Sequence, residues 1–300
     1  MRWIALALVT VGCVPAPEFR GVDARSDDAL DPADAAIDAT PLPPWGEPVL
    51  VAELQSKGSD ECAWLSDDRK ELFLVSLQPP NSKHQIYTAK RTSTTSLWSA
   101  PSPISELADP TRDMIKAVVS RSGLEMFVAA AAAQSMDYDI YWTDRLSPTA
   151  PWNALTLVDE LSTVTTWQIP GAFVAEDTTM YLTQQTGTGD FQIHTATRPA
   201  GSDQFTLTAL PVPNINSPEV DEHPWVNADE TLMFFSSERD GDRNIYTTSR
   251  ASRTQVWATP TLVENINIPG LDYCPFLVDD HTLYFTSFRG GQTHIYVSTR

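Results

Sequence analysis

Basic residues are scarce in this chain of 300 residues, which has 20 Lys and Arg against 39 Asp and Glu. The formal net charge is −19 at pH 7. Residues 1–13 carry +1 and residues 14–44 carry −5, so −15 remains on residues 45–300. Because nucleic-acid binding depends on Lys and Arg side chains that neutralise phosphates, this balance excludes nucleic acid as a partner. It leaves open whether the partner is a protein or a glycan.

Long apolar runs and catalytic signature motifs are also missing. The first thirteen residues, MRWIALALVTVGC, hold a nine-residue apolar run, which is too short to span a bilayer. No nucleophile elbow, metalloprotease helix, phosphate-binding loop or C-x-x-C pair occurs. No enzyme class is therefore indicated by a motif, and contact with a membrane is expected only through a lipid anchor.

The first thirteen residues are typical of a secretory signal peptide, with one Arg, an apolar run and small residues before Cys13. The ending Thr-Val-Gly-Cys resembles a bacterial lipobox, in which cleavage before the Cys is followed by lipidation of its thiol. We expect lipidation at Cys13, and the alternative is a plain signal peptide cleaved nearby. Both predict export, either anchored in the bacterial cell envelope (periplasm or outer membrane) or secreted.

Residues 14–44 are rich in Pro, Ala and acidic residues and contain one aromatic residue, Phe19. Such a segment cannot bury enough apolar surface to offset the entropy of ordering it. We therefore expect a disordered tether between the signal peptide and a domain that occupies residues 45–300.

Five strand-like runs follow at intervals of 50 to 54 residues, and each is closed by an Ile and an aromatic or His ring near a basic residue. The pairs are Ile86-Tyr87, Ile140-Tyr141, Ile193-His194, Ile245-Tyr246 and Ile295-Tyr296. A repeat of this length with β texture predicts an all-β, five-bladed β-propeller, in which each period is one four-stranded blade. In the fourth period we expect strands at 224–226, 232–235 and 244–247.

A second repeat lies out of phase with the first and predicts how the ring closes. Its members each open a segment that would form the outermost strand of a blade: Trp45, Trp98, Trp152, Phe205 and Trp257. The fifth period ends at Arg300 without such a segment, whereas a surplus copy precedes the first period at Trp45–Leu54. This N-terminal strand should complete the last blade and remove a free sheet edge.

The repeat pattern P-x-(hydrophobic)-x-x-(D/E)-x-x-L-x-F-x-S-x-R-x-G-x-x-x-I-Y resembles the WD-repeat-like propeller module of TolB and of many bacterial periplasmic or secreted proteins. The resemblance runs from Trp45 to the end and is strongest in periods one, four and five. TolB has six blades, whereas five repeats occur here, so the resemblance implies the fold without a role in the Tol envelope system.

Two cysteines remain once Cys13 is assigned to lipid, and they occupy equivalent positions in the first and fifth periods. They are Cys62, in Asp-Glu-Cys-Ala-Trp, and Cys274, in Asp-Tyr-Cys-Pro-Phe. If the ring closes, these blades are neighbours, and a disulfide would form if the Cα atoms lie within about 7 Å near the axis. Two buried free thiols are the alternative.

Acidic residues precede the expected innermost strands and form the candidate binding site. They are Asp60, Glu61, Asp113, Asp221, Glu222 and Asp272. In a propeller these positions gather at one mouth of the central channel, where several carboxylates could bind Ca²⁺; no other cofactor is expected. The alternative is a solvated acidic rim, or local caps of strand-end amides.

Trp64, Trp225 and Phe276 are expected to be packing wedges between blades, whereas Trp167 falls outside the aromatic series.

These observations favour a non-enzymatic binding or scaffold propeller whose ligand is unknown. The alternative is a carbohydrate-active hydrolase resembling the five-bladed arabinanase type, which places carboxylates from successive blades at a channel mouth. It would use two of four side chains as acid and base: Asp60, Asp113, Asp221 and Asp272. The third period offers Gln168 in place of a carboxylate, and the motifs of that type are not recognisable here.

Overall fold

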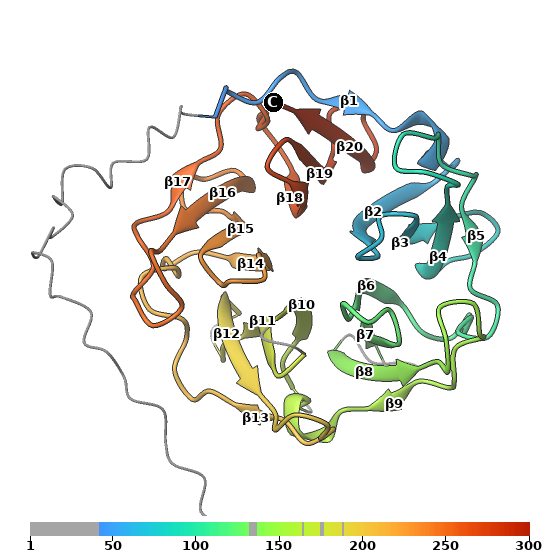
Figure 1. The fold of residues 1–300 in the computed structure, drawn as a ribbon, viewed down its shortest axis with the longest axis horizontal. Coiled ribbons are helices and arrows are strands. Elements are labelled where there is room, and N and C mark those ends of the chain that lie inside the picture. The colour runs from blue at the N-terminus through green and yellow to red at the C-terminus, as the bar shows by residue number, and fades with distance from the viewer. Residues whose placement is uncertain (1–41, 132–136, 164, 175–176, 188) are drawn as a thin grey trace, which may run out of the picture. The chain divides into compact units, whose positions relative to one another are not determined.

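The protein is a five-bladed β-propeller in a computed structural model that describes residues 42–131, 137–163, 165–174, 177–187 and 189–300. Residues Leu42–Arg300 form one compact unit. The predicted signal peptide, Cys13 and residues 14–41 of the predicted tether lie outside the described residues. Five four-stranded antiparallel sheets surround a central axis, as predicted (Figure 1).

Each blade contributes one strand to each of four concentric positions. The innermost strands are β2 (Ser59–Leu65), β6 (Met114–Val119), β10 (Gln168–Val174), β14 (Asp221–Val226) and β18 (Asp272–Asp279). The second strands are β3 (Glu71–Leu77), β7 (Glu125–Ala131), β11 (Thr179–Gln185), β15 (Leu232–Ser237) and β19 (Thr282–Ser287). The third strands are β4 (Gln85–Lys90), β8 (Tyr138–Asp144), β12 (Phe191–Thr197), β16 (Asn244–Ser249) and β20 (His294–Thr299). The short outer strands are β5 (Ser102–Pro103), β9 (Thr156–Leu157), β13 (Thr206–Leu207), β17 (Thr261–Leu262) and β1 (Val49–Leu50).

The N-terminal strand β1 completes the last blade, which confirms the predicted closure. Val49 pairs with Val297 and Leu50 with Tyr296, both on β20. The backbone N–H of Gly46 donates to the Thr299 carbonyl at 2.8 Å. The paired strand is shorter than the predicted segment, because a 3₁₀ turn at Ala52–Leu54 follows it at once.

A disulfide joins Cys62 and Cys274, with a Cα–Cα distance of 5.0 Å. It links the innermost strands of the first and fifth blades, the same two blades that the closure of the ring brings together. Both cysteines are buried. The ring is thus closed near its axis by a covalent bond and at its rim by β1.

A bulge interrupts the innermost strands and explains one difference from the sequence-based expectation. In the first, fourth and fifth blades the register shifts next to Cys62, His223 and Cys274, which all have positive φ. The bulge breaks the side-chain alternation, so the pattern predicted a strand only after it, at 224–226. The strand in fact begins at Asp221, and the predicted carboxylate pairs lie within the innermost strands instead of before them.

The bulges also connect neighbouring blades. The backbone N–H groups of the three bulged residues donate to a hydroxyl on the preceding blade: Cys62 to Thr286 at 2.8 Å, His223 to Thr183 at 3.0 Å and Cys274 to Ser236 at 3.2 Å.

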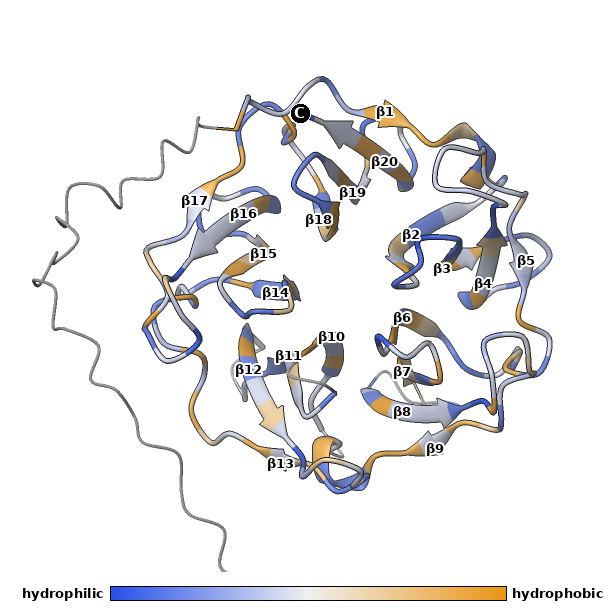
Figure 2. Ribbon diagram, in the orientation of Figure 1, coloured by the Kyte–Doolittle hydropathy of each residue, from blue (hydrophilic) through white to orange (hydrophobic). Residues whose placement is uncertain are grey.

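Hydrophobic residues are distributed over all five blades (Figure 2). No helical segment among the described residues is long and apolar enough to cross a membrane.

Candidate functional site

Three of the predicted site residues are fully buried caps of the loops that lead into the innermost strands. Asp60, Asp221 and Asp272 have no solvent exposure. Each accepts a hydrogen bond from the backbone N–H four residues earlier, at 2.7 Å, 2.5 Å and 2.7 Å respectively. In the third blade, Gln168 replaces the carboxylate and accepts from the Thr163 N–H at 3.2 Å. This repeated contact fixes the start of each innermost strand.

Each buried aspartate also has a basic partner. His294 contacts Asp60 at 3.1 Å, Arg239 contacts Asp221 at 2.6 Å and Arg289 contacts Asp272 at 3.1 Å. Burial raises the pKa of Asp272 despite its hydrogen bonds and the charge of Arg289. With these contacts made and no surface exposed, the three carboxylates cannot reach a ligand in this structure.

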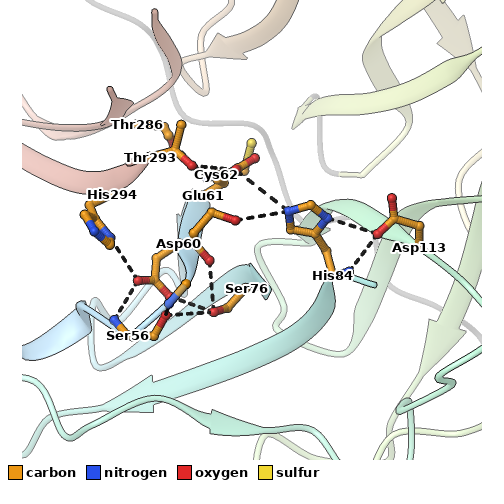
Figure 3. Close-up of polar contacts among 12 residues, drawn as sticks. Ser56, Asp60, Glu61, Cys62, Ser76, His84, Asp113, Thr286, Thr293 and His294 are labelled. Carbon is orange, nitrogen blue, oxygen red and sulfur yellow. Dashed lines mark hydrogen bonds and ion pairs between the residues drawn. The ribbon is translucent and has the colours of Figure 1, made fainter. Parts of the chain in front are cut away.

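Asp113 and Glu61 belong instead to a network that crosses from the first blade to the second, at the mouth where the innermost strands begin. We call this end of the channel the strand-start mouth, and Figure 3 shows the polar contacts of Glu61 and Asp113 there. The Asp113 carboxylate accepts from the His84 backbone N–H at 2.7 Å and lies 3.0 Å from His84 Nδ1. Tyr138 Oη donates to its other oxygen at 2.7 Å. Burial alone would raise the pKa of Asp113, but these hydrogen bonds outweigh it and lower that pKa to about 2.

His84 lies between two carboxylates, because its Nε2 is 3.8 Å from the Glu61 Oε1 atom. Burial opposes protonation of His84, but the hydrogen bond with Asp113 and the charge of Glu61 outweigh it and raise the pKa of the imidazole. Glu61 also accepts from Thr293 Oγ1 of the fifth blade at 2.7 Å. Burial and the nearby Glu61 carboxylate raise the pKa of Tyr273 well above its usual value.

Glu222 holds a second cluster at the same mouth. Its Oε1 atom lies 2.9 Å from Arg243 and 3.3 Å from His223 Nδ1. Burial would raise the pKa of Glu222, but His223, Arg243 and Lys116 lower it to about 2. Lys116 is fully buried, and this burial lowers the pKa of its amine to about 7 although the charge of Glu222 opposes the shift.

The six predicted carboxylates do not come together as one group of possible metal ligands within the described ranges. There, the only group of three His, Cys, Asp or Glu side chains whose ligand atoms lie within 4.8 Å of one another is Cys62, His223 and Cys274. The two sulfur atoms of that group are joined in the disulfide. They are therefore not available as thiolate ligands while the bond is intact.

Five residues at this mouth were missed by the sequence analysis although they share one position, two residues before the Ile of each repeat. They are His84, Tyr138, Phe191, Arg243 and Thr293. Trp167, the aromatic residue outside the predicted series, lies between two of them, with ring centroids 4.5 Å from Tyr138 and 5.6 Å from Phe191. The common register was the signal that could have identified them.

A cavity of about 310 Å³ occupies the opposite mouth, where all five innermost strands end; we call it the strand-end cavity. Its apolar wall includes the three predicted wedge residues, Trp64, Trp225 and Phe276, together with Phe173 and Val119. Trp64 and Phe276 are nearly buried, whereas Trp225 is half-buried. These rings both pack between blades and line a hollow at the axis.

Charged side chains from the ends of the innermost strands and from the turns that follow them surround this cavity. They are Asp67, Arg69, Arg121, Asp279 and Asp280, and the amide of Asn227 lies among them. Arg69 pairs with Asp279 at 2.9 Å across the boundary between the first and fifth blades. None of these residues was among the sequence-based candidates, because in the sequence they read only as turn residues.

Comparison with known proteins supports the fold. No protein-family model and no curated protein matches this chain. Among solved structures, TolB from Acinetobacter baumannii is similar with a TM-score of 0.53 and 12% identity, over 82% of this chain and 55% of that one. A thermostable family-43 glycoside hydrolase has a TM-score of 0.53 and 11% identity, over 82% and 91% of the two chains.

A third similar structure is a family-43 β-xylosidase/α-arabinofuranosidase from a compost microbial metagenome, in complex with xylotriose. It has a TM-score of 0.54 and 9% identity over 86% of this chain and 94% of that one. This chain spans about half of the TolB chain and most of both hydrolases. At these identities the likeness shows a shared propeller fold, as the sequence resemblance to TolB implied, and leaves the function to be argued from the site.

Proposed function

We propose that this protein is an exported, non-enzymatic binding propeller whose ligand occupies the strand-end cavity. The observation that carries this proposal is the cavity itself, which all five blades line; four of them contribute an aromatic ring, and polar and charged side chains surround the rim. Small-ligand sites are usually concave, with aromatic and apolar walls and convergent polar groups that orient the ligand. The partner is either a free small molecule or a group presented by a protein or glycan.

The carboxylates argue against the alternative of a carbohydrate-active hydrolase. Such an enzyme needs one carboxylic acid that is protonated near neutral pH. Of its four candidate side chains, Asp60, Asp221 and Asp272 are inaccessible, and the fourth, Asp113, has its pKa lowered to about 2. Glu222 has the same lowered pKa. The charged residues of the strand-start mouth therefore support a structural role that joins the blades.

Export is supported by the disulfide, since such bonds persist mainly in oxidising compartments. The signal-like N-terminus and Cys13 add a lipid anchor to the proposal. Replacing Cys13 by Ser should move the protein from the membrane fraction to the soluble fraction. A folded Cys13→Ser protein that stays in the membrane fraction would contradict the anchor without affecting the binding proposal.

Binding at the cavity is tested with two matched tryptophan variants. Ligands from a panel of oligosaccharides, amines and capped peptides that raise the Tm of the wild type would be titrated against Trp225→Leu and Trp167→Leu. Both residues are half-buried, but they lie at opposite mouths. We expect Trp225→Leu to weaken binding at least about tenfold and Trp167→Leu to retain the wild-type affinity. The reverse result, or hydrolysis of an arabinan or xylan substrate by the wild type, would refute the proposed function.

A further inference from the structure

Three aromatic rings form adjoining walls of the strand-end cavity. The ring of Phe276 lies between those of Trp64 and Trp225, at centroid distances of 4.8 Å and 6.2 Å. Both neighbours are inclined by 71° to it. The rings come from the first, fifth and fourth blades, which are consecutive around the axis, so the walls turn around the hollow instead of stacking in parallel.

Rings arranged in this way favour a cation over a neutral ligand. The face of an aromatic ring carries negative electrostatic potential, so a ring face that borders the hollow attracts a cation. Trp64 already has one such contact, because Lys116 Nζ lies 5.8 Å from its ring centroid. Since burial lowers the pKa of Lys116 to about 7, much of its charge is lost at pH 7 and above.

The charges at the rim favour a cation as well. The Asp279 carboxylate lies 2.9 Å from the Arg69 guanidinium and neutralises it. The charge of Arg121 is partly offset in the same way, because it interacts with the carboxylate of Asp177. Asp67 and Asp280 are both exposed and both line the cavity, and neither forms an ion pair among the described residues, although the charge of Asp280 does act on Arg300. The whole domain is also strongly acidic, which raises the local concentration of cations at a concave site.

From this geometry we infer that the strand-end cavity binds an organic cation, namely an alkylammonium or guanidinium group. The inference rests on the proposed function and specifies the chemistry of its ligand. A cavity of about 310 Å³ is at the lower end of the range for small-ligand sites, roughly 300–1,000 Å³, and suits a single cationic group. That group could belong to a free amine or to a Lys or Arg side chain of a partner protein.

The charge requirement is tested with choline and its uncharged analogue 3,3-dimethyl-1-butanol, titrated by calorimetry into the wild-type protein. We expect choline to bind at least about tenfold more tightly, because only the charged ligand can make a desolvated cation–π contact. A capped Ala-Lys-Ala peptide and its norleucine analogue distinguish a protein side chain from a free amine as the source. Equal affinity for a cation and its neutral analogue in both pairs would overturn the inference.

Two variants locate the site. Trp225→Leu should reduce choline affinity about tenfold, and the double variant Asp67→Asn, Asp280→Asn should reduce it about three- to tenfold at low salt. The matched control is Asp203→Asn, Asp242→Asn, which removes two exposed carboxylates outside the cavity and should leave the affinity unchanged. Choline binding with wild-type affinity in Trp225→Leu would overturn the inference. Xylotriose binding that depends on Trp225, without choline binding, would refute the cation and leave the proposed function intact.

Discussion

The guanidinium carbon of Arg300 lies 4.2 Å from the centroid of the Trp45 ring, which brings the last residue of the chain against the start of the propeller. The same contact recurs in every blade between the Arg that follows the third strand and the ring of the outer segment. The other pairs are Arg91 with Trp98, Arg145 with Trp152, Arg198 with Phe205 and Arg250 with Trp257. In the other four blades this contact joins residues that are close in the sequence. Between Trp45 and Arg300 it joins the two ends of the domain.

This closure predicts that Trp45→Ala destabilises the whole ring. Trp45 is buried against the fourth and fifth blades, and truncating a buried aromatic residue typically costs about 3–5 kcal/mol. The free energy of unfolding, measured by urea titration, should fall by about that amount. Leu146→Ala serves as the control, because Leu146 is 92% exposed and should change stability little. Equal losses in the two variants would show that Trp45 does not hold the ring closed.

The disulfide should contribute to stability independently of β1. Replacing Cys62 and Cys274 together by Ala should lower the free energy of unfolding by about 2–4 kcal/mol, because the bond restricts the unfolded chain. A reducing agent should lower the Tm of the wild type by a similar amount and leave the double variant unchanged. A reducing agent with equal effects on both proteins would contradict this contribution.

The pKa of Asp113 predicts a specific loss of stability in acid. Because its pKa is about 2 in the folded protein and 3.8 ordinarily, Asp113 stabilises the fold above about pH 4, and that stability is lost as the pH falls toward 2. Asp113→Asn should therefore be less stable than the wild type at pH 5, by about 1–2 kcal/mol allowing for solvent screening. The difference should shrink as the pH falls from 4 to 2. A difference that does not change with pH would contradict the lowered pKa.

His84 should show the opposite dependence at higher pH. Its folded pKa is raised, so the stability that it contributes is fully present below its ordinary pKa of 6.5 and is lost as the pH rises through the folded value. The stability difference between the wild type and His84→Gln, from urea titrations between pH 5 and 9, should thus be largest at the acidic end. NMR titration of the imidazole would measure the pKa directly, and a value below 6.5 would contradict the network.

The fold could be predicted from the sequence because its signals repeat. The Ile-aromatic pairs and the outer Trp series recur once per blade, and the surplus copy at Trp45 indicated the closure that Val49 and Leu50 make with β20. The site was harder to predict because it depends on contacts between blades. The Ser-x-Arg turn was visible in the sequence, for example, but not that Arg239 reaches back to Asp221 and removes that carboxylate from the surface.

The strand-end cavity shows the same limit. Trp64, Trp225 and Phe276 were expected to pack between blades, and they do. Which fraction of each ring faces the axis depends on how closely five blades approach one another, and no single period of the sequence contains that information. Asp67 and Asp280 likewise lie in turns of different blades, and only closure of the ring places them at one rim.

The charge of buried Lys116 should destabilise the fold below pH 10.5. Its pKa is 10.5 ordinarily and about 7 in the folded protein, so between these values the unfolded chain binds more protons. Stability linked to this residue therefore rises with pH across that window.

Lys116→Met removes the buried charge while leaving Glu222 paired with Arg243 at 2.9 Å. It should be more stable than the wild type by about 1–4 kcal/mol at pH 7, and the gain should shrink as the pH approaches 10.5. Urea titrations between pH 6 and 10, with the exposed Lys57→Met as control, would measure it. A gain that is independent of pH would mean that burial does not lower the pKa of Lys116, and a loss of stability would mean that its attraction to the charge of Glu222 outweighs the cost of its burial.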